Sequence, residues 1–472
     1  MEIVLVVIGV ALYYTILIAS VAWVFIRKRD AATAISWSLA ILFVPVLGLL
    51  IFLLFGRERV PWRLKRKLRH RPDFARRMAG FVPDAGGSRE GFAGIGRMAE
   101  QIDNAPIREG NGVSPLLEGA ETFESIKQAL GEAKHHIHIE EYIFRDDSKG
   151  RELLDLCCEK AREGVLVRLL VDAVGTGASR RLVLDLEKAG GDGEVFLPLF
   201  PFGKSLTPNL RNHRKIIICD GQVGFLGGMN VGDEYFGLKF KNRYWCDWHM
   251  RIEGPSVLDL QRVFVEDWDF VTGAELGGRD YFPSPRTRGD SRVQIVHSGP
   301  DEDVNSSRQV FFAAITRAEK RIGISSPYFV PDMAIREALR NAALRGVKVD
   351  ILTQGWPPET YATYFASRYY WEELMAVGVN IFEHRKKVLH GKGIIVDGQW
   401  AALGSTNLDP RSLQLNFEVM ALLDTPRDAL YAQAHLDKMI AEAHAVKPAE
   451  FARRGAFVRA VESGARLLGP IL

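Results

Sequence analysis

His213-Arg-Lys-Ile-Ile-Ile-Cys-Asp220 and His390-Gly-Lys-Gly-Ile-Ile-Val-Asp397 are the two stretches that decide the fold of this chain. In each, a lysine stands two residues after the histidine and an aspartate stands seven residues after it. A pair of small residues and then an asparagine follow at equal spacing in both copies: Gly227, Gly228 and Asn230, then Gly404, Ser405 and Asn407. One pattern written twice indicates an internal duplication.

The duplication extends to the segments that precede both stretches. Ala133-Lys-His-His-Ile-His-Ile matches Ala318-Glu-Lys-Arg-Ile-Gly-Ile, and Gly164-Val-Leu-Val matches Gly346-Val-Lys-Val. Each copy reads strand, helix, strand, helix, strand, strand, and its strands are rich in Val and Ile. The sequence therefore predicts two duplicated α/β units with pseudo-twofold symmetry and a mostly parallel sheet, over residues 105–275 and 292–440.

The two stretches predict chemistry at phosphorus. On a strand, alternate side chains point to one face, so each copy presents an imidazole beside an ammonium group. Two such pairs, with two side-chain amides, form a cationic pocket of hydrogen-bond donors that suits a phosphate. One imidazole can attack phosphorus while the other donates a proton to the leaving alkoxide. Because lysine and asparagine supply the electrostatic help, we expect neither a metal ion nor another cofactor.

This constellation resembles the HxKxxxxD signature of the phospholipase D superfamily. The resemblance implies that His213 is the nucleophile and His390 the general acid and base. It also implies that Asp220 and Asp397 brace loops, and that a carboxylate holds each imidazole. We assign that last role to Glu418 and, in the first copy, to Asp247.

The resemblance also implies which side chains bind the phosphate, namely Lys215, Lys392, Asn230 and Asn407. One departure is Gly228, where many members have serine, as this chain does at Ser405.

The N-terminus predicts a membrane anchor over residues 1–56. Residues 3–26 carry no charge and are numerous enough to cross the hydrocarbon core, and a second uncharged run covers 31–55. Pro45 and Gly48 interrupt the second run, which allows either a second span or a re-entrant hairpin. We therefore expect a multi-pass protein of the bacterial inner membrane.

Residues 57–104 read as a basic juxtamembrane stretch followed by a glycine-rich linker. Eight arginines and lysines between 57 and 71 favour an anionic membrane surface and a cytoplasmic catalytic part. The net charge of the whole chain is only +3, and no stripe of interleaved basic and aromatic residues indicates nucleic-acid binding. The C-terminal tail, residues 441–472, is either an interfacial amphipathic helix or a helix packed on the catalytic part.

Two longer sequence segments indicate which class of substrate to expect. Gly227-Gly-Met-Asn-Val-Gly-Asp-Glu-Tyr and Asn407-Leu-Asp-Pro-Arg-Ser-Leu-Gln-Leu-Asn-Phe-Glu resemble the bacterial cardiolipin synthases. That resemblance implies phosphatidyl transfer from one phosphatidylglycerol to another, which gives cardiolipin and glycerol. A hydrolytic phospholipase D, in which water replaces the acceptor, is the first alternative, and an inactive membrane scaffold is the second.

Overall fold

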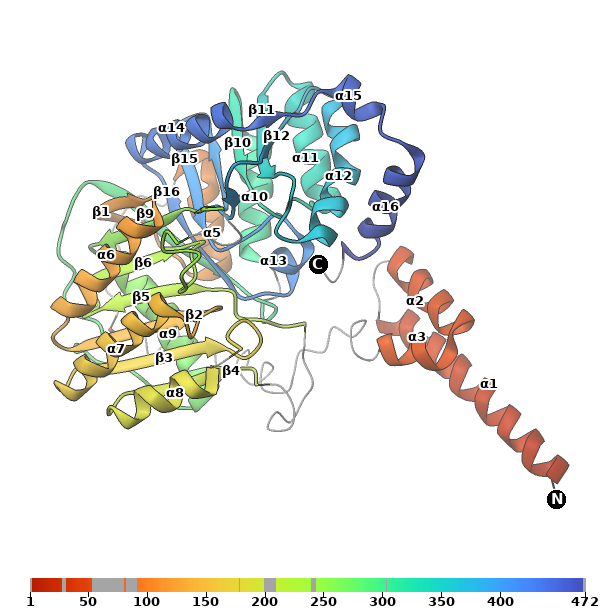
Figure 1. The fold of residues 1–472 in the computed structure, drawn as a ribbon, viewed down its shortest axis with the longest axis horizontal. Helices are drawn as coiled ribbons and strands as arrows, with labels where there is room; N and C mark the ends of the chain where they lie inside the picture. Colours follow the sequence, from red (N-terminus) through yellow and green to blue (C-terminus); the bar gives the residue numbers. More distant parts are fainter. Residues whose placement is uncertain are drawn as a thin grey trace. The chain divides into compact units, whose positions relative to one another are not determined.

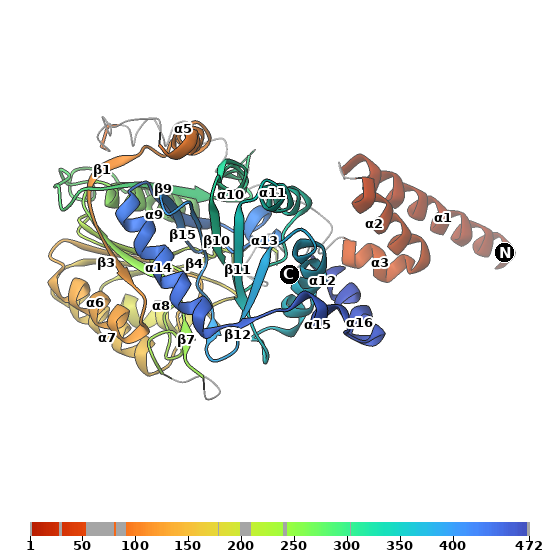
Figure 2. The same cartoon turned by 90° about the horizontal axis from the view of Figure 1, so that it is seen from above.

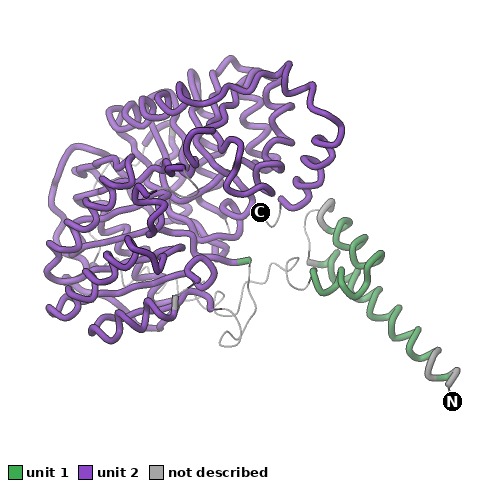
Figure 3. Tube along the Cα trace, viewed as in Figure 1, with its two compact units in different colours: residues 1–61, 199–209 green, residues 62–198, 210–472 purple. Residues whose placement is uncertain are grey.

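The computed structural model describes residues 2–27, 31–52, 80–81, 91–177, 179–198, 209–238, 243–302 and 304–469. The chain divides into two compact units, residues 1–61 with 199–209 and residues 62–198 with 210–472 (Figure 3). The predicted basic stretch lies outside the described residues, as does most of the predicted linker.

Among the described residues of the N-terminal unit, one helix is long and apolar enough to cross a membrane. Helix α1 (Glu2–Arg27) includes the apolar span Val7–Ile26. The second hydrophobic run is broken into α2 (Ala31–Phe43) and α3 (Pro45–Ile51). Pro45 occupies the first turn of α3, where a missing N–H costs little, but its ring cannot continue α2.

Helix α3 packs closely against α2. A side chain at Gly48 would place its Cβ 2.3 Å from the carbonyl oxygen of Ala40, so only glycine permits this approach. Phe52 meets Trp23 and Trp37 edge to face, at centroid distances of 5.6 and 5.4 Å. The second run is therefore a broken helix, as the positions of Pro45 and Gly48 suggested.

The described residues of the larger unit form one continuous sheet of 15 strands (Figure 1 and Figure 2). The first repeat contributes β1 (Arg108–Leu116), β2 (His136–Glu141), β3 (Leu166–Asp172), β4 (Asp192–Phe196), β5 (Lys215–Cys219), β6 (Val223–Gly227) and β8 (His249–Glu253). The second contributes β9 (Ser291–Ser298), β10 (Arg321–Ser325), β11 (Lys348–Gln354), β12 (Asn380–His384), β14 (Gly393–Val396), β15 (Trp400–Gly404), β16 (Glu418–Leu423) and β17 (His444–Ala445). A separate two-stranded ladder joins β7 (Trp245–Cys246) to β13 (Val388–Leu389).

The strand order confirms the predicted duplication. From the central β1–β9 pair outward, one side reads β1-β8-β6-β5-β2-β3-β4 and the other reads β9-β16-β15-β14-β10-β11-β12, with β17 added at the edge. Each strand of one repeat thus has its counterpart at the same distance from the junction. The two repeats are joined by antiparallel pairing of β1 with β9, not as separate sheets.

The prediction of a mostly parallel sheet is wrong. Parallel pairing is confined to β2-β3-β4 and β10-β11-β12, and the other ladders of the sheet are antiparallel. The cause is a tight hairpin after each motif strand. Asp220-Gly221 and Asp397-Gly398 all have positive φ, as a two-residue turn between antiparallel strands requires.

Helices cover both faces of the sheet (Figure 2). In the first repeat, Gly224 faces Leu260 of α9 (Val257–Thr272), whereas the adjacent Phe225 lies in the core on the other face. That core also contains α6 (Gly119–Glu132), α7 (Ser148–Arg162) and α8 (Ser179–Lys188). The second repeat copies this arrangement with α14 (Pro426–Glu442) on one face and α10 (Ser306–Arg317), α11 (Met333–Leu344) and α12 (Tyr361–Met375) on the other.

Part of the predicted linker is ordered structure. Phe92–Gly94 forms the short helix η2 and Ile95–Asp103 forms α5, with Ile95 and Ala99 buried in the core of the second repeat. The glycine-rich composition concealed this helix because it has only a few apolar anchors. Residues 95–103 therefore belong to the catalytic unit.

The C-terminal tail packs on the second repeat. It contains α15 (Pro448–Ala452) and α16 (Ala456–Arg466), and Glu462 of α16 is buried between Arg368 of α12 and Arg454. Of the two alternatives, the structure shows the packed helix. Its outer face nevertheless exposes Phe457 and Leu467.

Candidate active site

Backbone pairing between the repeats positions both motif histidines. The amide of His213 donates to the carbonyl of Phe417 over 2.9 Å, and the amide of His390 donates to the carbonyl of Cys246 over 2.8 Å. The residues that follow these two carbonyls are Glu418 and Asp247. Each histidine is thereby placed beside a carboxylate of the opposite repeat.

The side chains complete this crossed arrangement. Nδ1 of His213 lies 3.0 Å from both carboxylate oxygens of Glu418, and Nδ1 of His390 lies 2.5 Å from Oδ2 of Asp247. A carboxylate at Nδ1 favours the tautomer with its proton on that nitrogen and leaves the Nε2 lone pair available. Both carboxylates expected from the sequence contact an imidazole, and both pairs cross between the repeats.

Burial and charge set the protonation of these pairs. Burial lowers the pKa of His213 to about 4, although Glu418 opposes this shift, and burial with Lys392 lowers the pKa of His390. Burial raises the pKa of Glu418, but His213 and Lys215 outweigh it and hold that pKa below its usual range. The site at neutral pH thus contains a neutral His213 beside an ionised Glu418.

The two motif lysines are fully enclosed. Nζ of Lys215 donates to the carbonyl of His213 over 2.6 Å, and Nζ of Lys392 donates to the carbonyl of His390. Burial lowers the pKa of Lys215 to about 7 and that of Lys392 to about 8, while nearby carboxylates oppose both shifts. An anionic group entering between them would restore their full positive charge.

The two asparagines are also buried near the motif ends. Asn230 accepts a hydrogen bond from the amide of Ile143 over 3.3 Å. Oδ1 of Asn407 is buried and has no hydrogen-bond partner among the described residues. Because Oδ1 can only accept, the group of Asn407 that could donate to a phosphate oxygen is the NH2 of the same amide.

Ser405 and Gly228 show why the two copies differ at one position. Oγ of Ser405 donates to Oε2 of Glu418 over 2.5 Å and so fixes the carboxylate that holds His213. At Gly228, a Cβ would lie 2.1 Å from Oδ1 of Asp247. The first copy lacks the serine because Asp247 occupies the space that its side chain would need.

The motif aspartates lie away from the histidines. Asp220 accepts hydrogen bonds from the amides of Lys134, His135 and His136 at the far end of β5. Asp397 repeats this contact with the amides of residues 319–321. Five residues of strand separate Asp220 from the histidine end, which is about 17 Å. The two aspartates therefore lie outside the site and hold backbone amides, the loop-bracing position that the resemblance implied for them.

Aromatic side chains pack against both imidazoles, and no role was predicted for them from the sequence. Tyr142 packs edge to face on His213 at a centroid distance of 4.9 Å. Tyr235 and Trp245 pack on His390 at 5.5 and 5.0 Å. Both follow the first motif, in a segment whose contact with the second motif depends on the ladder between β7 and β13.

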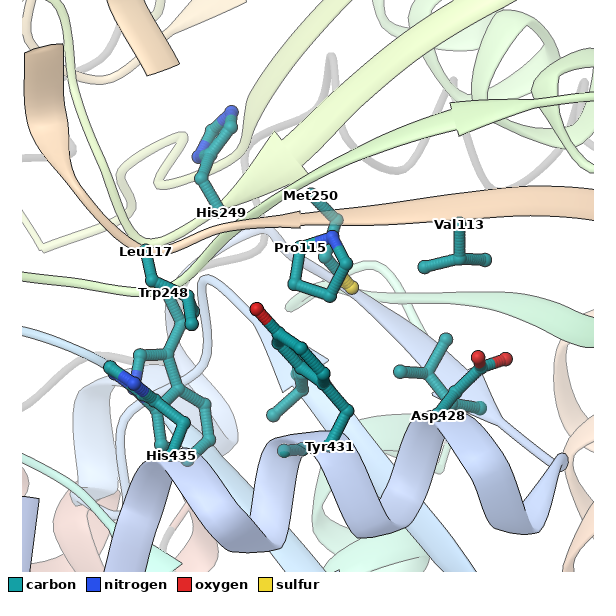
Figure 4. Close-up of a pocket in the computed structure, with 12 residues that line it drawn as sticks. Val113, Pro115, Leu117, Trp248, His249, Met250, Asp428, Tyr431 and His435 are labelled. Atoms are coloured by element: carbon teal, nitrogen blue, oxygen red, sulfur yellow. The ribbon is translucent and has the colours of Figure 1, made fainter. Parts of the chain in front are cut away.

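A small apolar hollow lies between α14 and the centre of the sheet (Figure 4). Trp248, Tyr431 and His435 line it, and Trp248 also packs against Gly391 and Gly393 of the second motif. The hollow thus adjoins the back of the site and is separate from the histidine pair.

One described group of side chains has an arrangement that a metal ion accepts. Ligand atoms of Asp103, His297 and Glu302 lie within 4.8 Å of one another. Nδ1 of His297 is 2.8 Å from Oδ2 of Asp103, so this contact joins α5 to β9. None of the three belongs to the motif strands.

Comparison with known proteins gives the family of this chain. A family model described as "Cardiolipin synthase, PLD-like domain" matches residues 126–268 and 311–440, one segment in each repeat. A second model, "Phospholipase_D-nuclease N-terminal", matches residues 16–57. A cardiolipin synthase of Geobacillus kaustophilus is 38% identical over 472 aligned residues, covering 95% of this chain and 90% of the relative.

The chain belongs to the cardiolipin synthase family. A second member, from Halalkalibacterium halodurans, is 36% identical and covers 95% of this chain and 91% of its own. Among solved structures, a phosphatidylserine synthase of Haemophilus influenzae superposes with a TM-score of 0.63 at 19% identity. The match covers 80% of this chain and 99% of that one, and shows a shared fold. The duplicated phospholipase D-like fold of the cardiolipin synthase family thus accounts for both repeats.

Proposed function

We propose that this chain is a membrane-bound phosphatidyltransferase that joins two phosphatidylglycerol molecules into cardiolipin and glycerol. The observation that carries the proposal is the crossed pair of contacts, His213 with Glu418 and His390 with Asp247. Two imidazoles with the same fixed tautomer, beside two buried lysines, are the groups that a two-step displacement at phosphorus needs.

In the first step, Nε2 of His213 attacks the phosphorus atom of one phosphatidylglycerol. The bond between phosphorus and the glycerol oxygen breaks, and His390 in its protonated form donates a proton to that oxygen. Glycerol leaves, and the phosphatidyl group remains on His213. The pKa of His213, lowered to about 4 by burial, supports its role because the nucleophile must be unprotonated.

In the second step, the neutral His390 removes a proton from the free glycerol hydroxyl of a second phosphatidylglycerol. That oxygen attacks phosphorus, the phosphorus–nitrogen bond breaks, and cardiolipin forms while His213 is regenerated. Lys215, Lys392, Asn230 and Asn407 hold the phosphate oxygens in both steps. Their burial supports the exclusion of water, which would otherwise give phosphatidic acid.

The anchor holds the enzyme at its lipid substrate. Helix α1 crosses the bilayer, whereas α2, with 13 residues, reaches about 20 Å and is too short for a core of about 30 Å. The second run then enters the bilayer as α2 and α3 and returns to the side it came from. This topology places Arg27 and the basic residues 57–71 on one side, the cytoplasmic one, next to anionic lipid.

The product of the purified full-length enzyme on phosphatidylglycerol vesicles tests the proposal. We expect cardiolipin and free glycerol in equal amounts, and their loss in His213→Ala and His390→Ala proteins. Phosphatidic acid as the sole product at every lipid density would establish the hydrolase instead. Undiminished turnover by both alanine variants would exclude the histidine mechanism.

A further inference from the structure

The loops that follow β10, β11 and β12 surround the second motif. Strand β14 pairs antiparallel with β10, and Gly393 lies opposite Ser325, so the carboxyl end of β10 adjoins the start of β14. Strands β11 and β12 run parallel to β10 and end at the same edge of the sheet. Helices α11 and α12 begin at this edge and run away from it.

Large apolar side chains stand exposed along this edge. Met333, the first residue of α11, is 70% exposed, and Trp356 and Tyr361 beside the start of α12 are 50% and 53% exposed. Leu467, after α16, is 71% exposed. The C-terminal segment reaches the same edge, because a Cβ at Gly469 would lie 3.8 Å from Cγ1 of Val330.

Two of these side chains form an ordered pair. The rings of Trp356 and Tyr361 meet edge to face at a centroid distance of 5.5 Å, so their exposed faces are held in place. Charged side chains of both signs accompany them. Arg385 and Lys386 are exposed after the end of β12, and Arg385 forms an ion pair with the buried Glu383. The exposed Glu359 lies between Trp356 and Tyr361 in the chain. We call Met333, Trp356, Tyr361, Leu467, Arg385 and Lys386 the repeat-two rim.

We propose that the repeat-two rim is a membrane-docking surface that inserts into the headgroup layer of an anionic bilayer beside the active site. Tryptophan and tyrosine favour this layer because each ring has an apolar body and a polar tip. Arginine and lysine attract the anionic lipids that surround them. The inference rests on the proposed function, since a lipid substrate must pass from the bilayer to the histidines across this edge.

Helix α11 provides a matched test, because Leu344 at its other end is also 70% exposed. The cysteines Cys157, Cys158, Cys219 and Cys246 are all buried, so a new surface cysteine can be labelled selectively. Full-length Met333→Cys and Leu344→Cys proteins carry an environment-sensitive fluorophore in vesicles of phosphatidylglycerol and phosphatidylcholine. We expect a blue shift and quenching by lipid-borne quenchers at residue 333 only.

A kinetic test uses the Trp356→Ser, Tyr361→Ser double variant. Its turnover of bilayer phosphatidylglycerol should fall about tenfold or more, as expected when a large side chain no longer leaves water. Its turnover of dispersed short-chain phosphatidylglycerol should stay within about twofold of wild type, less than 0.4 kcal/mol.

Equal fluorophore responses at residues 333 and 344, or equal losses on bilayer and dispersed substrate, would overturn the docking surface. A blue shift at residue 333 that appears without lipid as protein concentration rises would also overturn it, in favour of contact between copies. If wild type makes no cardiolipin from either form of substrate, the proposed function fails. The fluorescence comparison still decides docking in that case.

Discussion

His213 and Glu418 are 205 residues apart and belong to different repeats, yet Nδ1 of the imidazole lies 3.0 Å from both carboxylate oxygens. The same relationship joins His390 to Asp247 across 143 residues in the opposite direction. Each repeat therefore supplies the imidazole for one half of the site and the carboxylate for the other. A single repeat does not contain a complete histidine–carboxylate pair.

Replacement of Glu418 by glutamine should disable the His213 half of the site. The glutamine amide can present an N–H to Nδ1 and so stabilise the tautomer whose proton sits on Nε2, where the lone pair is needed. We expect kcat to fall about a hundredfold or more with little change in KM. The measurement is steady-state cardiolipin formation from phosphatidylglycerol vesicles.

The control for this variant is Ser405→Ala, which keeps the carboxylate and removes one hydrogen bond to it. Its kcat should fall about tenfold, between wild type and Glu418→Gln, because a group that orients a catalytic side chain contributes less than the side chain itself. A Glu418→Gln enzyme with kcat within threefold of wild type would exclude the tautomer role.

A serine at Gly228 should inactivate the His390 half of the site, although the second copy of this chain has serine at the matching position, Ser405. The new Cβ would lie 2.1 Å from Oδ1 of Asp247, so the carboxylate must leave Nδ1 of His390. We expect kcat to fall about as far as in Asp247→Asn, a hundredfold or more. Gly131→Ser, where no heavy atom lies within 4 Å of the new Cβ, should leave kcat unchanged. Normal kcat in Gly228→Ser would contradict the steric account.

Much of this site was predictable from the spacing of residues along the chain. The repeated pattern identified His213 and His390 with their lysines. The resemblance to the phospholipase D superfamily pointed to Glu418, 28 residues after His390, and to Asp247, 34 residues after His213. What spacing could not provide is the crossing of the pairs. The contact of His213 with Glu418 depends on backbone pairing between the repeats. The sequence of a single repeat contains no pattern that indicates this pairing.

The direction of the strands was also not predictable from their composition. Short Val- and Ile-rich runs suggested parallel strands, but they occur equally in the antiparallel centre of this sheet, where both faces are covered. The Asp-Gly pairs at residues 220–221 and 397–398 were the available signal, since that dipeptide favours a two-residue hairpin. The contacts of Tyr235 and Trp245 with His390 had no local signal.

Asp220 should contribute to stability and not to the chemical step. Its carboxylate accepts from three consecutive backbone amides, and its φ of 54° is a conformation that alanine adopts at a cost. Asp220→Ala should therefore lower the free energy of unfolding by about 2–4 kcal/mol. Thermal unfolding of the detergent-solubilised protein measures this loss.

The Asp220→Asn variant is the companion of this test, because asparagine tolerates positive φ and retains one acceptor oxygen. It should lose less stability than Asp220→Ala. Both proteins should keep wild-type kcat at temperatures well below their unfolding midpoints. A loss of kcat without any change in the unfolding midpoint would instead place Asp220 in the reaction.

The pH dependence of kcat/KM should report the buried lysines. Burial lowers the pKa of Lys215 to about 7 and that of Lys392 to about 8, so the free enzyme loses both charges as pH rises. The phosphate then meets fewer cations, so kcat/KM should decline from about pH 7 upward. Loss of the proton that His390 donates adds to this decline, because burial and Lys392 lower the pKa of His390 as well. An acid limb is expected near the pKa of His213, about 4, below which the nucleophile is protonated. Bound phosphate restores the lysine charges, so the basic limb of kcat itself should lie at higher pH.

A decline of kcat/KM at high pH could also arise if the protein unfolded there, but deprotonation of Lys215 does not favour unfolding. The pKa of Lys215 is about 7 in the folded chain and 10.5 as its ordinary value, so between these values the unfolded chain binds more protons than the folded one. Stability from this group therefore rises with pH across that window, while activity falls. Thermal midpoints measured beside kcat/KM separate the two effects. A kcat/KM that stays constant to pH 10 would show that the lysine charges do not bind the phosphate.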